Sequence, residues 1–151
     1  VNAAAYREGL KAFALKLDGK TAEWEGKMAA FKGRHVVAFH NSWPYFAERF
    51  GLKIDLFLEP KPGIPPTPAH LSAVIARMKA ENIGVILVEP YQNRKTAEKV
   101  AAQTGAAIVE FTQYPGGVRG TEGGYIDLMD HLVNTLAAAL NQLASIKREQ
   151  P

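Results

Sequence analysis

Three short apolar runs, each followed closely by a polar side chain, constrain the fold of this chain most strongly. They occupy residues 36–39, 84–88 and 107–111, and the polar residues that follow them include His40, Glu89 and Gln113. Strands that are apolar on both faces are typical of parallel sheets covered by helices. Because parallel strands end at one edge of a sheet, we expect these side chains to share the edge where open α/β sheets bind ligands.

The pattern after Gly33 alternates short apolar runs with helical stretches, which indicates βαβ units. We predict strands at 35–39, 54–58, 84–88 and 107–111, and helices at 43–50, 67–81, 93–104 and about 122–147. Right-handed crossovers then give an α/β fold with a small four-stranded parallel sheet, order 2-1-3-4, and helices on both faces. This order puts the switch point between the first and third strands, between His40 and Glu89.

A long helix is predicted before the sheet, over residues 2 to about 32. Its apolar side chains are spaced to form one stripe: Tyr6, Leu10, Phe13, Leu17, Trp24, Met28 and Phe31. Gly19 and Gly26 each cost about 1 kcal/mol relative to Ala, so the helix could break around Gly19. The stripe is a surface through which the chain could self-associate or dock on a partner.

Composition excludes several classes of protein. The 151 residues suit one domain, and the net charge of +3 comes from scattered basic residues, so no nucleic-acid partner is expected. The chain has no cysteine, which removes disulfides and thiolate metal sites. No apolar run approaches a membrane span, and the first residues lack the pattern of a signal peptide. The chain also starts without Met, so we expect it to be part of a longer protein.

His40 is the strongest candidate metal ligand, because imidazole suits zinc and related ions. It could equally be a polar strand end bound to loop backbone. Glu89 is either an oxygen ligand to the same ion or a carboxylate that caps the following helix, and Gln113 is a weaker candidate because amide oxygens rarely bind such metals. Of the other histidines, His35 is expected to be structural, and His70 and His131, within helices, are expected to have solvent or packing roles.

Two loops flank this edge. The segment 59–68 contains five prolines and is expected to be stiff. It begins with a Glu-Pro pair that resembles the pair at 89–90. The glycine-rich segment 116–124 is expected to form a flexible lid or a tight turn.

Three strings of residues resemble a known family: Val36–Leu52, Ile86–Pro90 and Gly124–Met129. They are similar to the carboxyl-terminal lobe of the zinc- and manganese-binding solute-binding proteins of ABC importers. The resemblance implies that residues 1–32 are the backbone helix joining two lobes, that 33–151 are the second lobe, and that the first lobe is absent. His40 falls on the family's ligand from this lobe, whereas Gln113 stands where the family often has Asp. Glu89 is then our candidate for the replacement ligand.

The resemblance implies a periplasmic or extracytoplasmic protein that binds zinc or manganese in an interlobe cleft and delivers it to an ABC permease. It implies no enzymatic activity. It also implies that this chain alone binds the metal weakly or leaves the site unoccupied. The alternative is a small metal-dependent hydrolase using the same strand-end residues around an activated water.

Overall fold

The computed structural model describes residues 2–61 and 63–149, with side chains described up to residue 144, so Pro62 of the proline-rich segment lies outside the described residues. The elements in chain order are α1 (Ala3–Met28), a short 3₁₀ turn η1 (Ala29–Phe31), β1 (His35–Ala38), α2 (Pro44–Phe50), β2 (Lys53–Phe57), α3 (Pro68–Ala80), β3 (Val85–Val88), α4 (Arg94–Thr104), β4 (Ala107–Glu110) and α5 (Tyr125–Glu149). The predicted elements are all present, with ends that differ by up to four residues.

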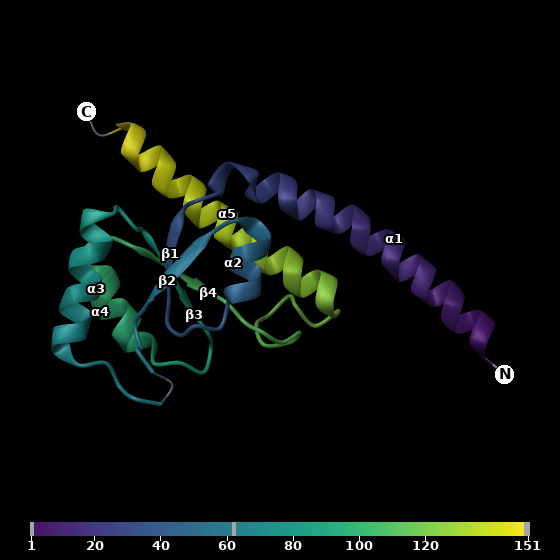
Figure 1. Ribbon diagram of the computed structural model, residues 1–151, viewed down its shortest axis with the longest axis horizontal. Coiled ribbons are helices and arrows are strands. Elements are labelled where there is room, and N and C mark those ends of the chain that lie inside the picture. The colour runs from purple at the N-terminus through teal and green to yellow at the C-terminus, as the bar shows by residue number, and fades with distance from the viewer. Residues whose placement is uncertain (1, 62, 150–151) are drawn as a thin grey trace.

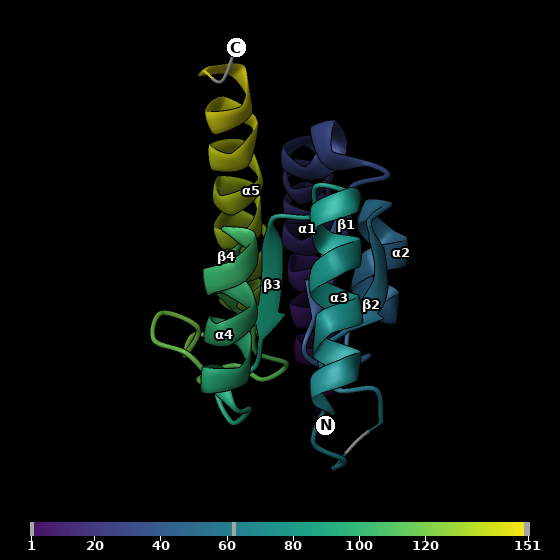
Figure 2. The same cartoon turned by 90° about the vertical axis from the view of Figure 1, so that its left-hand side faces the viewer.

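The four strands form one parallel sheet in the order β2-β1-β3-β4, as the sequence predicts. Helices α3 and α4 cover one face, while α2 and α5 cover the other, with α1 lying along α5 (Figures 1 and 2). Side chains alternate between these faces: Val36 and Ala38 belong to the core beneath α5, and Val37 and Phe39 to the core beneath α3 and α4. The central strands are therefore buried on both sides, which explains their continuous apolar sequence.

The helix α1 runs without interruption through Gly19, so the predicted break there is wrong. Its carboxyl-terminal half buries Trp24 and Met28 against the core. Its amino-terminal half extends beyond the rest of the chain (Figure 1). Tyr6 and Leu10 of the predicted stripe are 75% and 67% exposed. Within the described residues, therefore, only the second half of the stripe packs against the rest of the chain.

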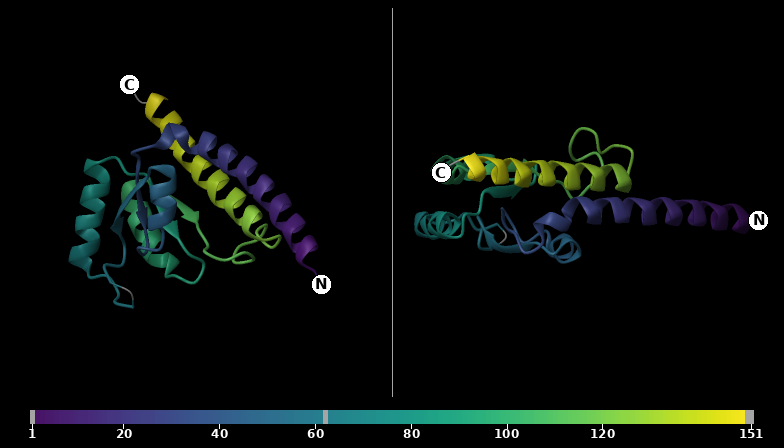
Figure 3. Two further views of the ribbon diagram at one scale, coloured as in Figure 1. Left: turned by 45° about the vertical axis from the view of Figure 1, so that its right-hand side comes forward. Right: turned by 90° about the horizontal axis from the view of Figure 1, so that it is seen from above.

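Polar contacts fix α1 on α5, and the two helices lie side by side (Figure 3). Trp24 Nε1 donates to Asp130 Oδ1 at 2.7 Å, and Lys20 Nζ lies 2.9 Å from Asp130 Oδ2. Burial alone would raise the pKa of the Asp130 carboxyl, but the hydrogen bonds from Lys20 and Trp24 bring that pKa below its usual value. The long first helix is thereby held in a defined direction relative to the sheet.

Helix α5 begins at Tyr125, three residues later than expected. Gly124 has a φ of +117°, a conformation that L side chains rarely adopt, and it keeps the preceding loop out of the helix. Within residues 2–61 and 63–149, no helix has the length and hydropathy that a membrane span requires.

Candidate metal site

His40 and Glu89 stand at the carboxyl ends of neighbouring strands. Ala38 of β1 pairs with Leu87 of β3, and the two candidate ligands each follow two residues later. Helix α2, which follows β1, and helix α4, which follows β3, cover opposite faces of the sheet. The switch point of the sheet therefore lies between His40 and Glu89, as the strand order predicts.

Glu59 stands on the other side of His40. Phe57 of β2 also pairs with Ala38, so Glu59 follows this pair by two residues, as His40 does. The backbone amide of Glu59 donates to the Phe39 carbonyl oxygen at 3.0 Å, which prolongs the pairing of β1 and β2 beyond the strands. His40 Nε2 then lies 2.6 Å from Glu59 Oε2. The prediction that His40 sits at the ligand-binding edge therefore agrees with the structure, but its carboxylate neighbour is Glu59.

Sequence reasoning missed Glu59 as a site residue because its proline-rich surroundings indicated only a stiff loop. One signal was present, since Glu59-Pro60 resembles Glu89-Pro90, whose glutamate was a candidate. Both glutamates come soon after the end of a strand, so both can lie at the same edge of the sheet. The pairing of β2 with β1 decides that Glu59 faces His40.

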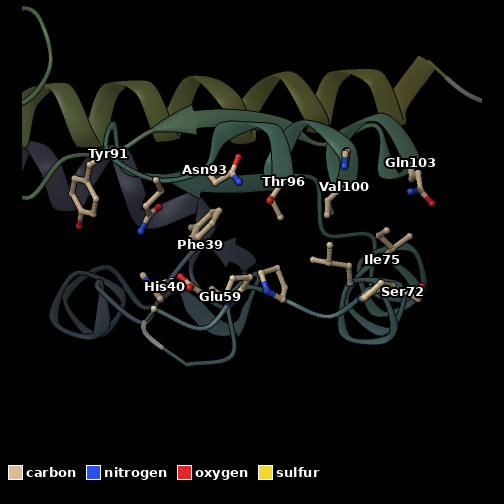
Figure 4. A pocket seen from close by; sticks show the side chains of 17 residues that line it. Phe39, His40, Glu59, Ser72, Ile75, Tyr91, Asn93, Thr96, Val100 and Gln103 are labelled. Carbon is tan, nitrogen blue, oxygen red and sulfur yellow. Dashed lines mark ion pairs between the residues drawn. The ribbon is translucent and has the colours of Figure 1, made fainter.

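A cavity of about 740 Å³ opens beside His40 and Glu59. The two side chains lie together on one wall, and Tyr91, Asn93 and Thr96 lie on the opposite wall (Figure 4). Helices α3 and α4 extend the cavity away from the strand ends. A ligand in this cavity would meet an imidazole and a carboxylate on one wall and amide or hydroxyl groups on the opposite wall.

Glu89 is completely buried, and it lines neither this cavity nor the second cavity described below. Neither of its carboxylate oxygens has a hydrogen-bond partner among the described residues. Its interpretation as a helix cap is wrong, because Asn93 is the N-cap residue of α4 and the Glu89 carboxylate accepts no amide there. Burial raises the pKa of the nearby Tyr91 phenol, and the Glu89 carboxylate raises it further.

Gln113 is exposed and lies three residues beyond β4. It lines a second cavity of about 430 Å³, with Trp43 of the β1–α2 loop and Tyr125 and Leu128 of α5. The structure therefore places Gln113 at the same edge of the sheet but in a different cavity from His40. Its role as a ligand stays a prediction.

Of the other histidines, His35 lies away from this edge, whereas His70, in the first turn of α3, contacts the last residue of β2. His35 opens β1 at the opposite edge, where its Nδ1 is 3.5 Å from Asp55 Oδ1 and from Glu81 Oε2. His70 Nε2 is 3.0 Å from the Phe57 carbonyl oxygen, and His131 lies within α5. The structural role of His35 and the solvent or packing roles of His70 and His131 stay predictions.

The glycine-rich loop between β4 and α5 is tightly hydrogen-bonded. Thr121 is completely buried, and its Oγ1 accepts from the Gly116 amide at 2.9 Å and donates to the Val118 carbonyl at 2.7 Å. A second bond joins the Gly116 amide to the Thr121 carbonyl at 3.0 Å. Of the two predicted forms, these contacts favour the tight turn over the flexible lid.

The described residues contain no group of three or more His, Asp or Glu side chains arranged to hold a metal ion. The edge near His40 offers one imidazole and one carboxylate, about half of the four ligands that zinc takes in proteins. An ion at this edge would need further ligands from another protein surface or from water.

Comparison with known proteins identifies relatives across most of the chain. The high-affinity zinc uptake system protein ZnuA of Brucella suis biovar 1 (strain 1330) is 25% identical over 93% of this chain. The manganese-binding lipoprotein MntA of Halalkalibacterium halodurans is 29% identical over 72% of it. A crystal structure of ZnuA superposes with a TM-score of 0.76 at 23% identity, covering 91% of this chain, and supports the fold.

The matches cover only part of each relative. The chain spans 42% of the Brucella suis protein, 37% of MntA and 49% of the ZnuA structure. The family model described as zinc-uptake complex component A, periplasmic, matches residues 1–139. This match extends from the first helix to the middle of α5, so the chain belongs to the ZnuA family of periplasmic zinc-uptake components.

Proposed function

We propose that this chain is one lobe of a periplasmic protein that captures a divalent transition metal, zinc foremost, for delivery to an ABC permease. The observation that carries the proposal is His40, which is 21% exposed at the switch point of the sheet and faces a cavity with a carboxylate beside it. The family membership and the zinc and manganese named in the relatives support the same conclusion. A periplasmic location is part of the family's description.

Capture and release need no covalent chemistry. The neutral His40 imidazole offers one nitrogen lone pair, and further ligands come from a second lobe that closes over the same edge. Affinity is then set by ligand type and geometry, since intrinsic affinities alone would favour copper over zinc. Glu89 and Gln113 remain candidate ligands that would each have to turn toward His40 when the ion binds.

In this proposal residues 1–32 are the helix that joins the two lobes, and 33–151 are the second lobe. The exposed apolar side chains of α1, including Tyr6, Leu10 and Phe13, would pack against the first lobe. Sedimentation of this chain tests the surface directly, because a Leu10→Glu variant should abolish any self-association through it. A dimer that survives the substitution would mean that another surface associates.

The hydrolase alternative receives no support. A catalytic ion is usually held by three protein ligands with one open position, and the described residues contain no group of three or more His, Asp or Glu side chains arranged to hold a metal ion. The relatives named above carry names of metal uptake and metal binding, not of hydrolysis.

A calorimetric zinc titration of this chain and of its His40→Ala variant tests the proposal. We expect weak binding that the substitution abolishes, while His131→Gln, in α5, leaves it unchanged. Parallel titrations with manganese establish which metal the site prefers. Binding that is equally strong in His40→Ala would overturn the proposed site.

A further inference from the structure

His40 and Glu59 form a close pair of potential metal ligands at the carboxyl edge of the sheet. The 2.6 Å between Nε2 and Oε2 is a close contact between an imidazole nitrogen and a carboxylate oxygen. The two side chains are only 21% and 12% exposed, and both line the same cavity. Neither the family match nor the sequence pattern assigns Glu59 a role.

We infer that Glu59 is the carboxylate that this lobe supplies to the ion beside His40. The inference rests on the proposed function and names a ligand for it. The incoming cation takes the place of the proton between Nε2 and Oε2. Nε2 gives up its proton to solvent and Nδ1 takes one up, so the ring stays a neutral imidazole and the lone pairs of Nε2 and Oε2 face the ion. Imidazole nitrogen and carboxylate oxygen are both ordinary zinc ligands.

The geometry of the two atoms suits this exchange. Nitrogen and oxygen ligands of a tetrahedral zinc ion lie roughly 3.3 Å apart, given bond lengths of about 2.0–2.2 Å. The pair therefore has to open by less than 1 Å from its present 2.6 Å, which a small side-chain rotation provides. The backbone amide of Glu59 is held by the Phe39 carbonyl, so the carboxylate starts from a fixed position.

The competing candidates are placed less favourably. Gln113 offers a neutral amide, is exposed and lines another cavity. Glu89 has a carboxylate but is completely buried, so an ion from solvent would reach it only after the surrounding loops opened. Glu59 alone among the three combines a carboxylate, access to the cavity and contact with His40.

The test uses this chain and compares matched variants by zinc competition against a coloured chelator. Glu59→Gln keeps the shape of the side chain but removes its charge, and we expect zinc affinity to fall by at least about tenfold. Glu48→Gln, on the exposed side of α2, removes the same charge elsewhere and should leave affinity unchanged. Gln113→Ala should also have no effect, and Glu59→Asp should recover part of the loss.

A spectroscopic measurement separates a ligand from a residue that only orients His40. In chain labelled with ¹³C at glutamate side-chain carboxyls, the Glu59 resonance should shift when zinc is added, and Glu59→Gln identifies it. The shift is measured on the unsubstituted chain, and Glu59→Asp, which also removes the labelled resonance, assigns it if Glu59→Gln folds poorly. A resonance that stays in place while zinc binds overturns the assignment of Glu59.

The outcomes distinguish this inference from the proposed function. If His40→Ala weakens zinc binding and Glu59→Gln does not, the site stands and Glu59 is not its carboxylate. If Gln113→Ala weakens binding instead, the amide supplies the missing ligand. If neither His40→Ala nor Glu59→Gln changes binding, the proposed function fails as well.

Discussion

Trp24 Nε1 donates a 2.7 Å hydrogen bond to Asp130 Oδ1, and this contact joins residues of α1 and α5 that are 106 positions apart in the sequence. Lys20 binds the same carboxylate, so Asp130 receives one neutral and one charged donor. The direction in which α1 leaves the sheet depends on this cluster. Because residues 1–32 are proposed to join two lobes, the contact also bears on how those lobes are oriented.

Replacing Trp24 by Phe should therefore destabilise the chain by more than replacing Trp43. Both tryptophans are buried, at 2% and 6% exposure, but Trp43 Nε1 has no hydrogen-bond partner among the described residues. Hydrogen bonds to charged groups contribute about 1.5–3 kcal/mol, so Trp24→Phe should lose roughly that much more than Trp43→Phe. Urea unfolding followed by circular dichroism measures the difference, and equal losses would mean that the indole contact contributes nothing.

Acid should destabilise the chain through Asp130 and Asp55. The hydrogen bond from Arg77 lowers the pKa of Asp55, and those from Lys20 and Trp24 lower the pKa of Asp130 in spite of burial. A lowered folded-state pKa stabilises the fold fully above the unfolded value of about 3.9, and this stabilisation is lost as pH falls through the folded-state value.

We expect the melting temperature of the chain to fall steeply when the pH is lowered from neutral to below about 4. The fall should be shallower in Asp130→Asn, which has already lost the charged interaction. Asp18→Asn, at an exposed position of α1, should behave as the unsubstituted chain does. If the three acid profiles coincide, Asp130 makes no pH-dependent contribution to stability.

Gly19→Ala should stabilise the chain, in contrast to Gly117→Ala. A Cβ at Gly19 meets no atom within 4 Å in a continuous helix, so the gain approaches the helix-propensity difference of about 1 kcal/mol. A Cβ at Gly117 would overlap Thr112 Oγ1, which accepts a hydrogen bond from the Tyr114 amide. Thermal unfolding of the two variants should shift in opposite directions. A lower melting temperature for Gly19→Ala would contradict the continuous helix.

Glu89→Gln should lower the pKa of Tyr91. Burial raises the pKa of this phenol first, and the negative charge of Glu89 adds to the effect, so removing the charge favours the tyrosinate. Ultraviolet absorbance of tyrosinate during an alkaline titration measures the change, with Tyr91→Phe to identify the signal. An unchanged titration would show that the buried carboxylate carries no charge near Tyr91.

The sequence by itself determined the fold class and the strand order. Short apolar runs with both faces buried, separated by helical stretches, are local patterns, and the right-handed crossover leaves few ways to connect them. The same patterns put His40 at the ligand-binding edge, because a residue that follows a parallel strand can lie nowhere else. The prediction of a break at Gly19 was wrong because packing of Trp24 and Met28 in the core outweighs the cost of one glycine.

Only the tertiary structure decided which side chains meet His40. The pairing of β2 with β1 brings Glu59 to 2.6 Å from its Nε2, while Gln113 turns to a different cavity and Glu89 is buried. These three residues look alike in sequence, as polar groups at or near the ends of strands. Register and side-chain packing involve residues far apart in the chain, and no local pattern encodes them. That edge, with its one imidazole and one carboxylate, is where the proposed metal capture will be tested.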